Sequence, residues 1–268
     1  MYSLKTIALK SLLFSILFFS IPSFIYSKSS ITKDSVNLSN QKTAALLEMV
    51  MKSLPADKKA IFEETLQALT SVKPSVSTID LTGKTVSFIP LAHASSAGFY
   101  ENVRDLVLEY KTKGYKIYYE QVRSEKRSIA DSTVKDTTRL KFRKMIGVEP
   151  TRESYSILKK LVPALVVQPP YKDLGVSDSD INADVTTRQM VDKYEELYGE
   201  IRLTACDFET QLGTIIYPCE KLVNDNKVVI IDFRNRYVAD LIKNAKDNKI
   251  LVLYGADHIK GIAELIRQ

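Results

Sequence analysis

The chain has 268 residues, of which 45% are hydrophobic and 26% are charged. This is the composition of a globular protein with enough apolar residues to bury a core, and it excludes a largely disordered chain. The formal net charge is +6 and falls to +4 without Lys5 and Lys10, which is too small an excess to indicate a nucleic-acid partner.

Residues 1–27 have the pattern of a signal peptide. Lys5 and Lys10 lead into an apolar stretch, residues 11–27, that carries no charge and is interrupted by Pro22. The stretch is short for a bilayer span of about 20 apolar residues, so the pattern predicts cleavage and export to the periplasm or the exterior. No stable transmembrane span is then expected, and an uncleaved N-terminal membrane anchor is the alternative.

The next segment, residues 28–43, has the polar composition of a flexible linker. A single α/β domain is predicted for residues 44–268. Its first part, residues 44–73, has apolar residues at helical spacing interrupted by Pro55, which predicts short N-terminal helices.

A strand, a helix and a second strand follow in residues 85–119. The pattern predicts a strand at 85–92, a helix at 97–113 that Ser95 or Ser96 caps, and a strand at 115–119. A βαβ unit of this kind implies parallel strands.

The middle of the chain, residues 133–216, predicts a helical insertion. Thr186 or Thr187 opens a helix that runs to Tyr198, and the only candidate strand is 164–167. The remainder alternates again, with a strand at 227–231, a helix at 235–246, a strand at 249–254 and a helix from Ile259. The predicted fold is therefore α/β, with a mainly parallel sheet flanked by helices.

The two cysteines, Cys206 and Cys219, are separated by twelve residues. An oxidising compartment would allow them to form a disulfide across a short loop. Two buried free thiols are the alternative.

The only two histidines of the chain stand in equivalent places. His93 follows the predicted strand 85–92, and His258 follows the predicted strand 249–254. Glu120 ends the strand between them, and ligands of open α/β sheets bind at this edge. Two imidazoles and a carboxylate suit a catalytic divalent metal ion. Alternatively His93 is a hydrogen-bonded loop residue, His258 a helix cap, and Glu120 an ion-pair partner of Arg234.

Four boxes in a fixed order carry a family resemblance. They are Phe88-Ile-Pro-Leu-Ala-His93, Tyr119-Glu120-Gln-Val-Arg123, Phe233-Arg234-Asn235 and Tyr254-Gly255-Ala-Asp-His258. Together with Ala183-Asp184-Val185, they make residues 82–268 resemble the TraB, GumN and TIKI superfamily, which is distantly similar to the erythromycin esterases and the ChaN-like proteins. The first box departs from the family pattern, because Pro90 stands where a glycine is expected.

The resemblance implies a metal-dependent hydrolase of a peptide or a small molecule, most simply a peptidase. His93 and His258 would be metal ligands, and Glu120 a third ligand or the general base. Arg234 would stabilise a developing oxyanion or orient Glu120, and Asn235 would hold the metal ion or a substrate carbonyl. Two alternatives stay open: a binding or sequestering protein of the cell envelope, and a metal-free esterase in which one histidine is the general base.

Overall fold

The computed structural model describes residues 70–124, 137–147, 164–214 and 217–268, together with Lys52, Pro55 and Lys59. The predicted signal peptide and linker, and almost all of the helices predicted within 44–73, lie outside these residues. No helix in the described part of the chain is long and apolar enough to cross a membrane.

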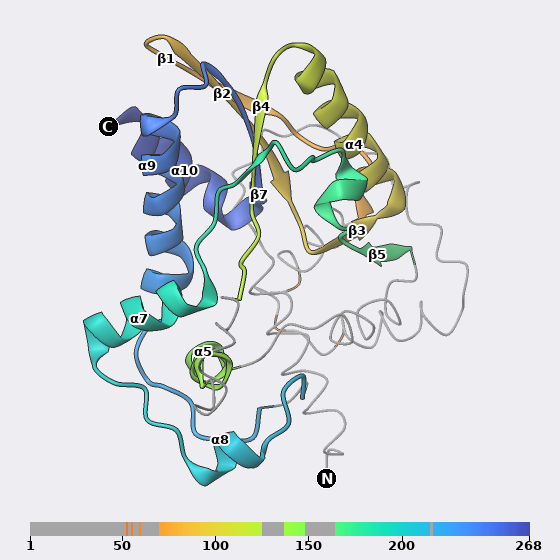
Figure 1. Cartoon of the computed structure of the whole chain (residues 1–268). Helices are drawn as coiled ribbons and strands as arrows, with labels where there is room; N and C mark the ends of the chain where they lie inside the picture. Colours follow the sequence, from red (N-terminus) through yellow and green to blue (C-terminus); the bar gives the residue numbers. More distant parts are fainter. Residues whose placement is uncertain are drawn as a thin grey trace.

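A five-stranded sheet forms the centre of the protein, in the order β1-β2-β7-β4-β6 (Figure 1). Its strands are β1 (Ser77–Leu81), β2 (Lys84–Leu91), β4 (Lys116–Tyr119), β6 (Ile181–Asn182) and β7 (Lys249–Gly255). The strands β2, β7, β4 and β6 are parallel, and β1 pairs with β2 in the antiparallel sense. The predicted α/β class and mainly parallel sheet are confirmed.

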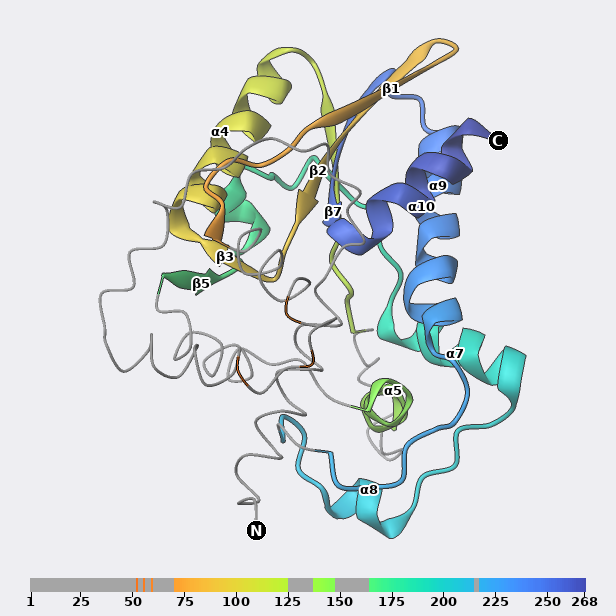
Figure 2. The same cartoon turned by 180° about the vertical axis from the view of Figure 1, so that it is seen from behind.

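Helices cover both faces of this sheet. One face carries α4 (Ala97–Thr112), and the other carries α9 (Arg234–Asn244) and α10 (Ala256–Arg267) (Figures 1 and 2). The strand β7 supplies both cores because its side chains alternate between the faces. Its Leu251 and Leu253 pack toward α4, whereas Ile250 and Val252 pack toward α9 and α10.

A two-stranded antiparallel sheet lies beside the beginning of α4. It consists of β3 (Ala94–Ser96) and β5 (Leu165–Val167), and the short 3-10 helix η2 (Tyr171–Leu174) follows β5. The candidate strand at 164–167 is thus confirmed. Ser96 caps α4 as predicted, because its side chain accepts a hydrogen bond from the backbone of Phe99 at 3.1 Å.

Three further helices are α5 (Thr138–Ile146), α7 (Thr187–Tyr198) and α8 (Ala205–Glu209). The helix α7 starts and ends as predicted, and Thr186 forms a capping box with Gln189. Cys206 of α8 forms a disulfide with Cys219, and their Cα atoms are 5.8 Å apart. The predicted disulfide is therefore confirmed.

The strand predicted at 227–231 is wrong. These residues belong to the π-helix η3 (Val228–Phe233), which continues into α9. The strand that pairs with both β2 and β4 is β7, and Val229 packs instead into a cluster with Met190 and Tyr194 of α7. The β-branched run thus follows its packing rather than its strand propensity.

The last helix also begins earlier than predicted. The helix α10 starts at Ala256, with Gly255 as its N-cap residue, so His258 lies in the first helical turn. The predicted position of His258 in a loop before a helix from Ile259 is therefore wrong. His258 is 4% exposed, because the Ile262 side of α10 packs on the sheet.

Candidate functional site

Three neighbouring strands end at one edge of the sheet and bring the predicted site residues together. Leu91 of β2 lies opposite Gly255 of β7, and Tyr119 of β4 lies opposite Leu253 of β7. His93, Glu120 and His258 follow these strand ends within a few residues. The predicted arrangement at the carboxyl edge is confirmed for Glu120 and His258, since Oε1 and Nε2 of these two residues are 3.9 Å apart.

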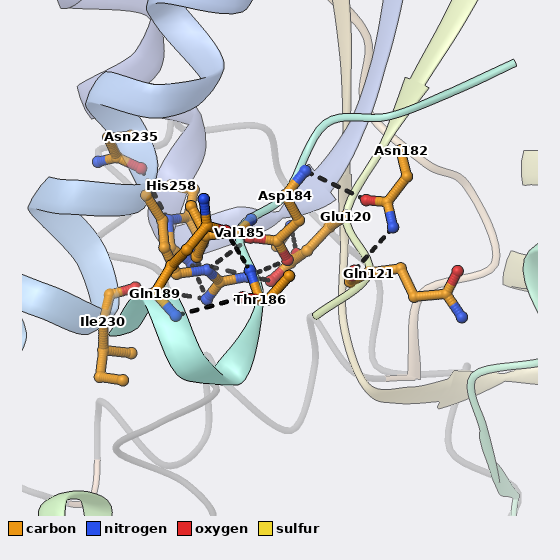
Figure 3. A network of polar contacts seen from close by, with 12 residues as sticks. Glu120, Gln121, Asn182, Asp184, Val185, Thr186, Gln189, Ile230, Asn235 and His258 are labelled. Carbon is orange, nitrogen blue, oxygen red and sulfur yellow. Dashed lines mark hydrogen bonds and ion pairs between the residues drawn. The ribbon is translucent and has the colours of Figure 1, made fainter. Parts of the chain in front are cut away.

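Arg234 contacts Glu120, Asp184 and His258, whose side chains lie together in Figure 3. It begins α9 and is 6% exposed. Its guanidinium group donates to Glu120 Oε1, to both carboxylate oxygens of Asp184 at 3.0 and 2.8 Å, and to the carbonyl of Ile230 at 3.3 Å. The fifth contact joins Nη1 to His258 Nε2 at 3.1 Å. Each of the five N–H groups of Arg234 therefore has a partner.

Glu120 is fixed by donors on both oxygens. Arg234 donates to Oε1, and the backbone N–H of Gly255 donates to Oε2. Burial alone would raise the pKa of Glu120, but the positive charge of Arg234 outweighs it and holds this pKa at about 2. Glu120 is therefore a permanent anion whose side chain is 12% exposed.

His258 has a defined proton position. Its Nδ1 lies 2.7 Å from Oδ1 of Asn235, an oxygen that only accepts, so Nδ1 carries the hydrogen. The lone pair of Nε2 then accepts from Arg234. Burial lowers the pKa of His258 to about 4 against the opposing charge of Glu120, so the imidazole is neutral at neutral pH.

Two glycines make room for this network. A Cβ atom on Gly255 would lie 2.9 Å from Oε2 of Glu120, which explains the glycine of the second box. A Cβ atom on Gly261 of α10 would overlap the side-chain amide of Asn235. Only a residue without a side chain lets α9 and α10 approach closely enough for Asn235 to reach His258.

His93 is the exposed member of the group. It lies between β2 and β3, and its carbonyl accepts a hydrogen bond from the backbone of Gln168 at 2.8 Å. Its positive form would lower the pKa of both Glu120 and His258, so it lies within electrostatic reach of the two. His93 is thus an exposed residue within electrostatic reach of a buried anion.

Pro90 of the first box lies in β2 opposite Tyr254 of β7. Pairing of β2 with β1 ends at Phe88, so no strand in the described part of the chain pairs with Pro90 on that side. Proline is tolerated in a sheet where one side of the strand is unpaired.

Three residues around the site have no role assigned from the sequence. Asp184 follows β6 and forms a doubly hydrogen-bonded ion pair with Arg234, and the Ala183-Asp184-Val185 motif of the resemblance was the available signal. Asp257 precedes His258, and burial together with the charge of Glu120 raises its pKa to about 7. Tyr171 of η2 packs on Tyr119, and no local pattern distinguishes it from a core tyrosine.

The residues in this arrangement do not fit a metal ion. Both nitrogens of His258 and both oxygens of Glu120 already have hydrogen-bond partners, and the nearest cation is Arg234. Among the residues that the structure describes, no three His, Cys, Asp or Glu side chains are grouped so as to hold a metal ion. A ligand set made of His93, Glu120 and His258 would require Arg234 to release His258.

The geometry also distinguishes between the roles expected for Arg234 and Asn235. Arg234 has no N–H left for an oxyanion, so the arrangement favours its orienting Glu120. The Oδ1 atom of Asn235 is bound to His258, and its Nδ2 atom lies against Gly261 of α10.

Comparison of the chain with known protein families, with curated proteins and with solved structures finds no match.

Proposed function

We propose that the chain is a hydrolase, related to the TraB, GumN and TIKI superfamily, that cleaves a peptide or a small-molecule ester at the carboxyl edge of the sheet. The observation that carries the proposal is an exposed His93 within electrostatic reach of the buried, ionised Glu120, at the carboxyl edge of the sheet. A fixed anion of this kind stabilises the imidazolium that forms when a histidine takes a proton from water.

His93, rather than Glu120, is the general base in this proposal. A base is efficient when its pKa lies near the working pH, and a carboxylate with a pKa of about 2 is too weak a base to take a proton from water. His258 is unsuited because Arg234 uses the lone pair of its Nε2. Arg234 and Gly255 hold Glu120 ionised and in place, and Asn235 holds His258.

The proton transfers of the reaction need only His93, with Glu120 to stabilise its charged form. An imidazole nitrogen of His93 takes one proton from water, and the water oxygen bonds to the substrate carbonyl carbon while the carbonyl π pair moves onto its oxygen. The oxyanion then reforms the carbonyl, the bond to the leaving oxygen or nitrogen breaks, and the leaving group takes the proton back from His93.

The test is turnover by the purified chain on a panel of p-nitrophenyl esters and internally quenched peptides. His93→Ala and Glu120→Gln are each expected to reduce kcat by about 100-fold or more. Asp184→Asn is the matched control, because it also removes a carboxylate partner of Arg234 but not the anion next to His93. Full turnover by His93→Ala would refute the proposal.

A metal-dependent form of the same hydrolase is the second candidate. It is the form that the family resemblance implies for His93, Glu120 and His258, and it needs an arrangement different from the one in the structure. In this form a divalent ion would have to displace Arg234 from His258. Activity that persists after exhaustive chelation supports the first form, and activity that is lost and then restored by added Zn²⁺ or Mn²⁺ supports the second.

Export is a further part of the proposal. The disulfide between Cys206 and Cys219 is typical of proteins in oxidising compartments. Pulse labelling of the full chain, followed by N-terminal sequencing of the mature protein, tests whether residues 1–27 are removed. A binding or sequestering role in the envelope would be the conclusion if the purified chain hydrolyses nothing.

A further inference from the structure

Hydrolysis at His93 requires a hydrogen-bond donor for the oxyanion, and Arg234 does not supply it. All five of its N–H groups are already bound to Glu120, Asp184, Ile230 and His258. Removal of one such donor from an acyl-transfer site typically reduces kcat by about 100- to 1000-fold. A donor other than Arg234 should therefore lie close to His93 and Glu120.

Tyr171 lies at the junction of the segments that carry these two residues. Its ring packs on the ring of Tyr119, with 4.8 Å between centroids, and Tyr119 directly precedes Glu120. On the other side, the backbone N–H of Gln168 donates to the carbonyl of His93 at 2.8 Å. The segment 168–171 thus connects the His93 loop to the end of β4.

The surrounding structure fixes the position of Tyr171. Its carbonyl accepts from the N–H of Val176 at 3.1 Å, and Leu174 of the same short helix is 1% exposed in the core under α4. Lys111 of α4 donates to the carbonyl of Gly175 at 2.7 Å. A donor held in this way needs little reorganisation when charge develops on a substrate.

The hydroxyl of Tyr171 is protonated at neutral pH. Burial raises the pKa of Tyr171 well above its usual range, and the negative charge of Glu120 adds to this effect. The side-chain amide of Gln168 acts in the opposite direction and lowers this pKa. The residue as a whole remains half-buried rather than fully enclosed.

We propose that the Tyr171 hydroxyl donates a hydrogen bond to the oxyanion that forms when water adds to the substrate carbonyl. This inference rests on the proposed function and makes Tyr171 a catalytic residue in it. The proton stays on Tyr171 throughout, because His93 alone accepts and returns the proton of water.

Tyr171→Phe in the full chain tests the inference, since it removes the hydroxyl and keeps the ring that packs on Tyr119. We expect kcat to fall by about 100-fold with KM changed by less than about twofold. Tyr115→Phe is the matched control, because Tyr115 is also half-buried and its ring packs on that of Tyr110, with 4.7 Å between centroids. Tyr115 lies at the opposite end of β4, away from the site. The kcat of this control should equal that of the unmodified chain.

A second measurement separates an oxyanion donor from a merely structural residue. Sulfur accepts hydrogen bonds more weakly than oxygen, so the ratio of kcat on an ester to kcat on its thionoester should be high in the unmodified chain and should fall in Tyr171→Phe. A variant with unchanged kcat, or with equal losses on both substrates, would overturn the inference.

The variants also keep this inference separate from the proposed function. If His93→Ala abolishes turnover and Tyr171→Phe does not, the role of Tyr171 is refuted and the hydrolase stands. If the unmodified chain hydrolyses no ester or peptide of the panel, the proposed function and the role of Tyr171 both fail.

Discussion

At the scale of single residues, the two histidines occupy opposite environments. His93 is exposed in a loop, whereas His258 is buried in α10 between Asn235 and Arg234. Truncation of His258 should therefore affect the fold far more than truncation of His93. Removal of the His258 side chain would leave two buried polar groups without a partner.

His258→Ala should lower the free energy of unfolding by about 2–3 kcal/mol, because Nη1 of Arg234 and Oδ1 of Asn235 lose their hydrogen bonds to the imidazole. His93→Ala should change it by less than about 0.5 kcal/mol. Urea titration followed by circular dichroism measures both. Equal losses in the two variants would contradict this account of the site.

Gly261→Ala should destabilise the protein by about 1–3 kcal/mol, since the new methyl group would overlap the side chain of Asn235. Gly98→Ala in α4 is the control, because its methyl group meets only the exposed side chain of Val72, at 3.2 Å, and alanine has the higher helix propensity. The double variant Asn235→Ala/Gly261→Ala should lose less stability than the two single losses added together. If the stability losses of the two single variants simply add in the double variant, the new methyl group does not clash with Asn235.

At the scale of helices and strands, local patterns predict those elements whose own residues carry the signal. The helix α4 has a capping serine and an apolar face, and β7 has an unbroken apolar run, so both were found from the sequence. The residues of η3 have the same β-branched composition as a buried strand. Only the packing of Val229 against α7 shows that these residues form a helix rather than a strand. That contact joins segments far apart in the chain, so no local pattern reveals it.

The candidate site also combines residues that a local sequence pattern predicts with residues that it does not. His93, Glu120, Arg234 and His258 could be placed together because each stands next to a predicted strand or helix boundary. Asp184 and Tyr171 reach the site through β6, a strand of two residues, and through η2, which carry no sequence pattern strong enough to predict. The hydrogen bonds that use up the donors of Arg234 depend on tertiary packing alone.

The disulfide of α8 should contribute about 3 kcal/mol to stability, because it closes a short loop. Arg143 and Lys144 of α5 bind this loop through the carbonyls of Asp207 and Thr210 and the carboxylate of Asp207. Dithiothreitol should therefore lower the urea midpoint. The variant Cys206→Ser/Cys219→Ser should start at the lower midpoint and not respond to the reductant, and an unchanged midpoint in the unmodified protein would argue against a structural role.

At the scale of the whole molecule, the site makes stability depend on pH in two opposing ways. His258 has an ordinary pKa of 6.5 and a pKa of about 4 in the fold, so its contribution to stability is lost as pH falls from 6.5 to 4. Asp257 has an ordinary pKa of 3.8 and a pKa of about 7 in the fold, so its contribution is lost as pH rises from 3.8 to 7. The two effects nearly cancel between pH 6.5 and 4.

Stability should therefore be nearly constant from pH 6.5 to 4.5 and should fall below pH 4.5, where Glu120 begins to bind a proton in the unfolded chain but not in the fold. Asp257→Asn removes one of the opposing contributions. The variant should then lose about 1.4 kcal/mol per pH unit on acidification below pH 6.5. Thermal melts in a pH series measure this, and a variant whose stability stays constant over that range would contradict the assignment.

The position of β7 in the middle of the sheet has a consequence for the order of folding. This strand lies between β2 and β4, yet it follows both of them in the sequence, after the whole of α5, α7 and α9. Until residues 249–255 insert, β2 and β4 each present an unpaired edge, and neither face of the sheet has its central side chains. Loops that must close over such long separations form slowly, so the sheet is expected to assemble late and all at once rather than strand by strand during synthesis.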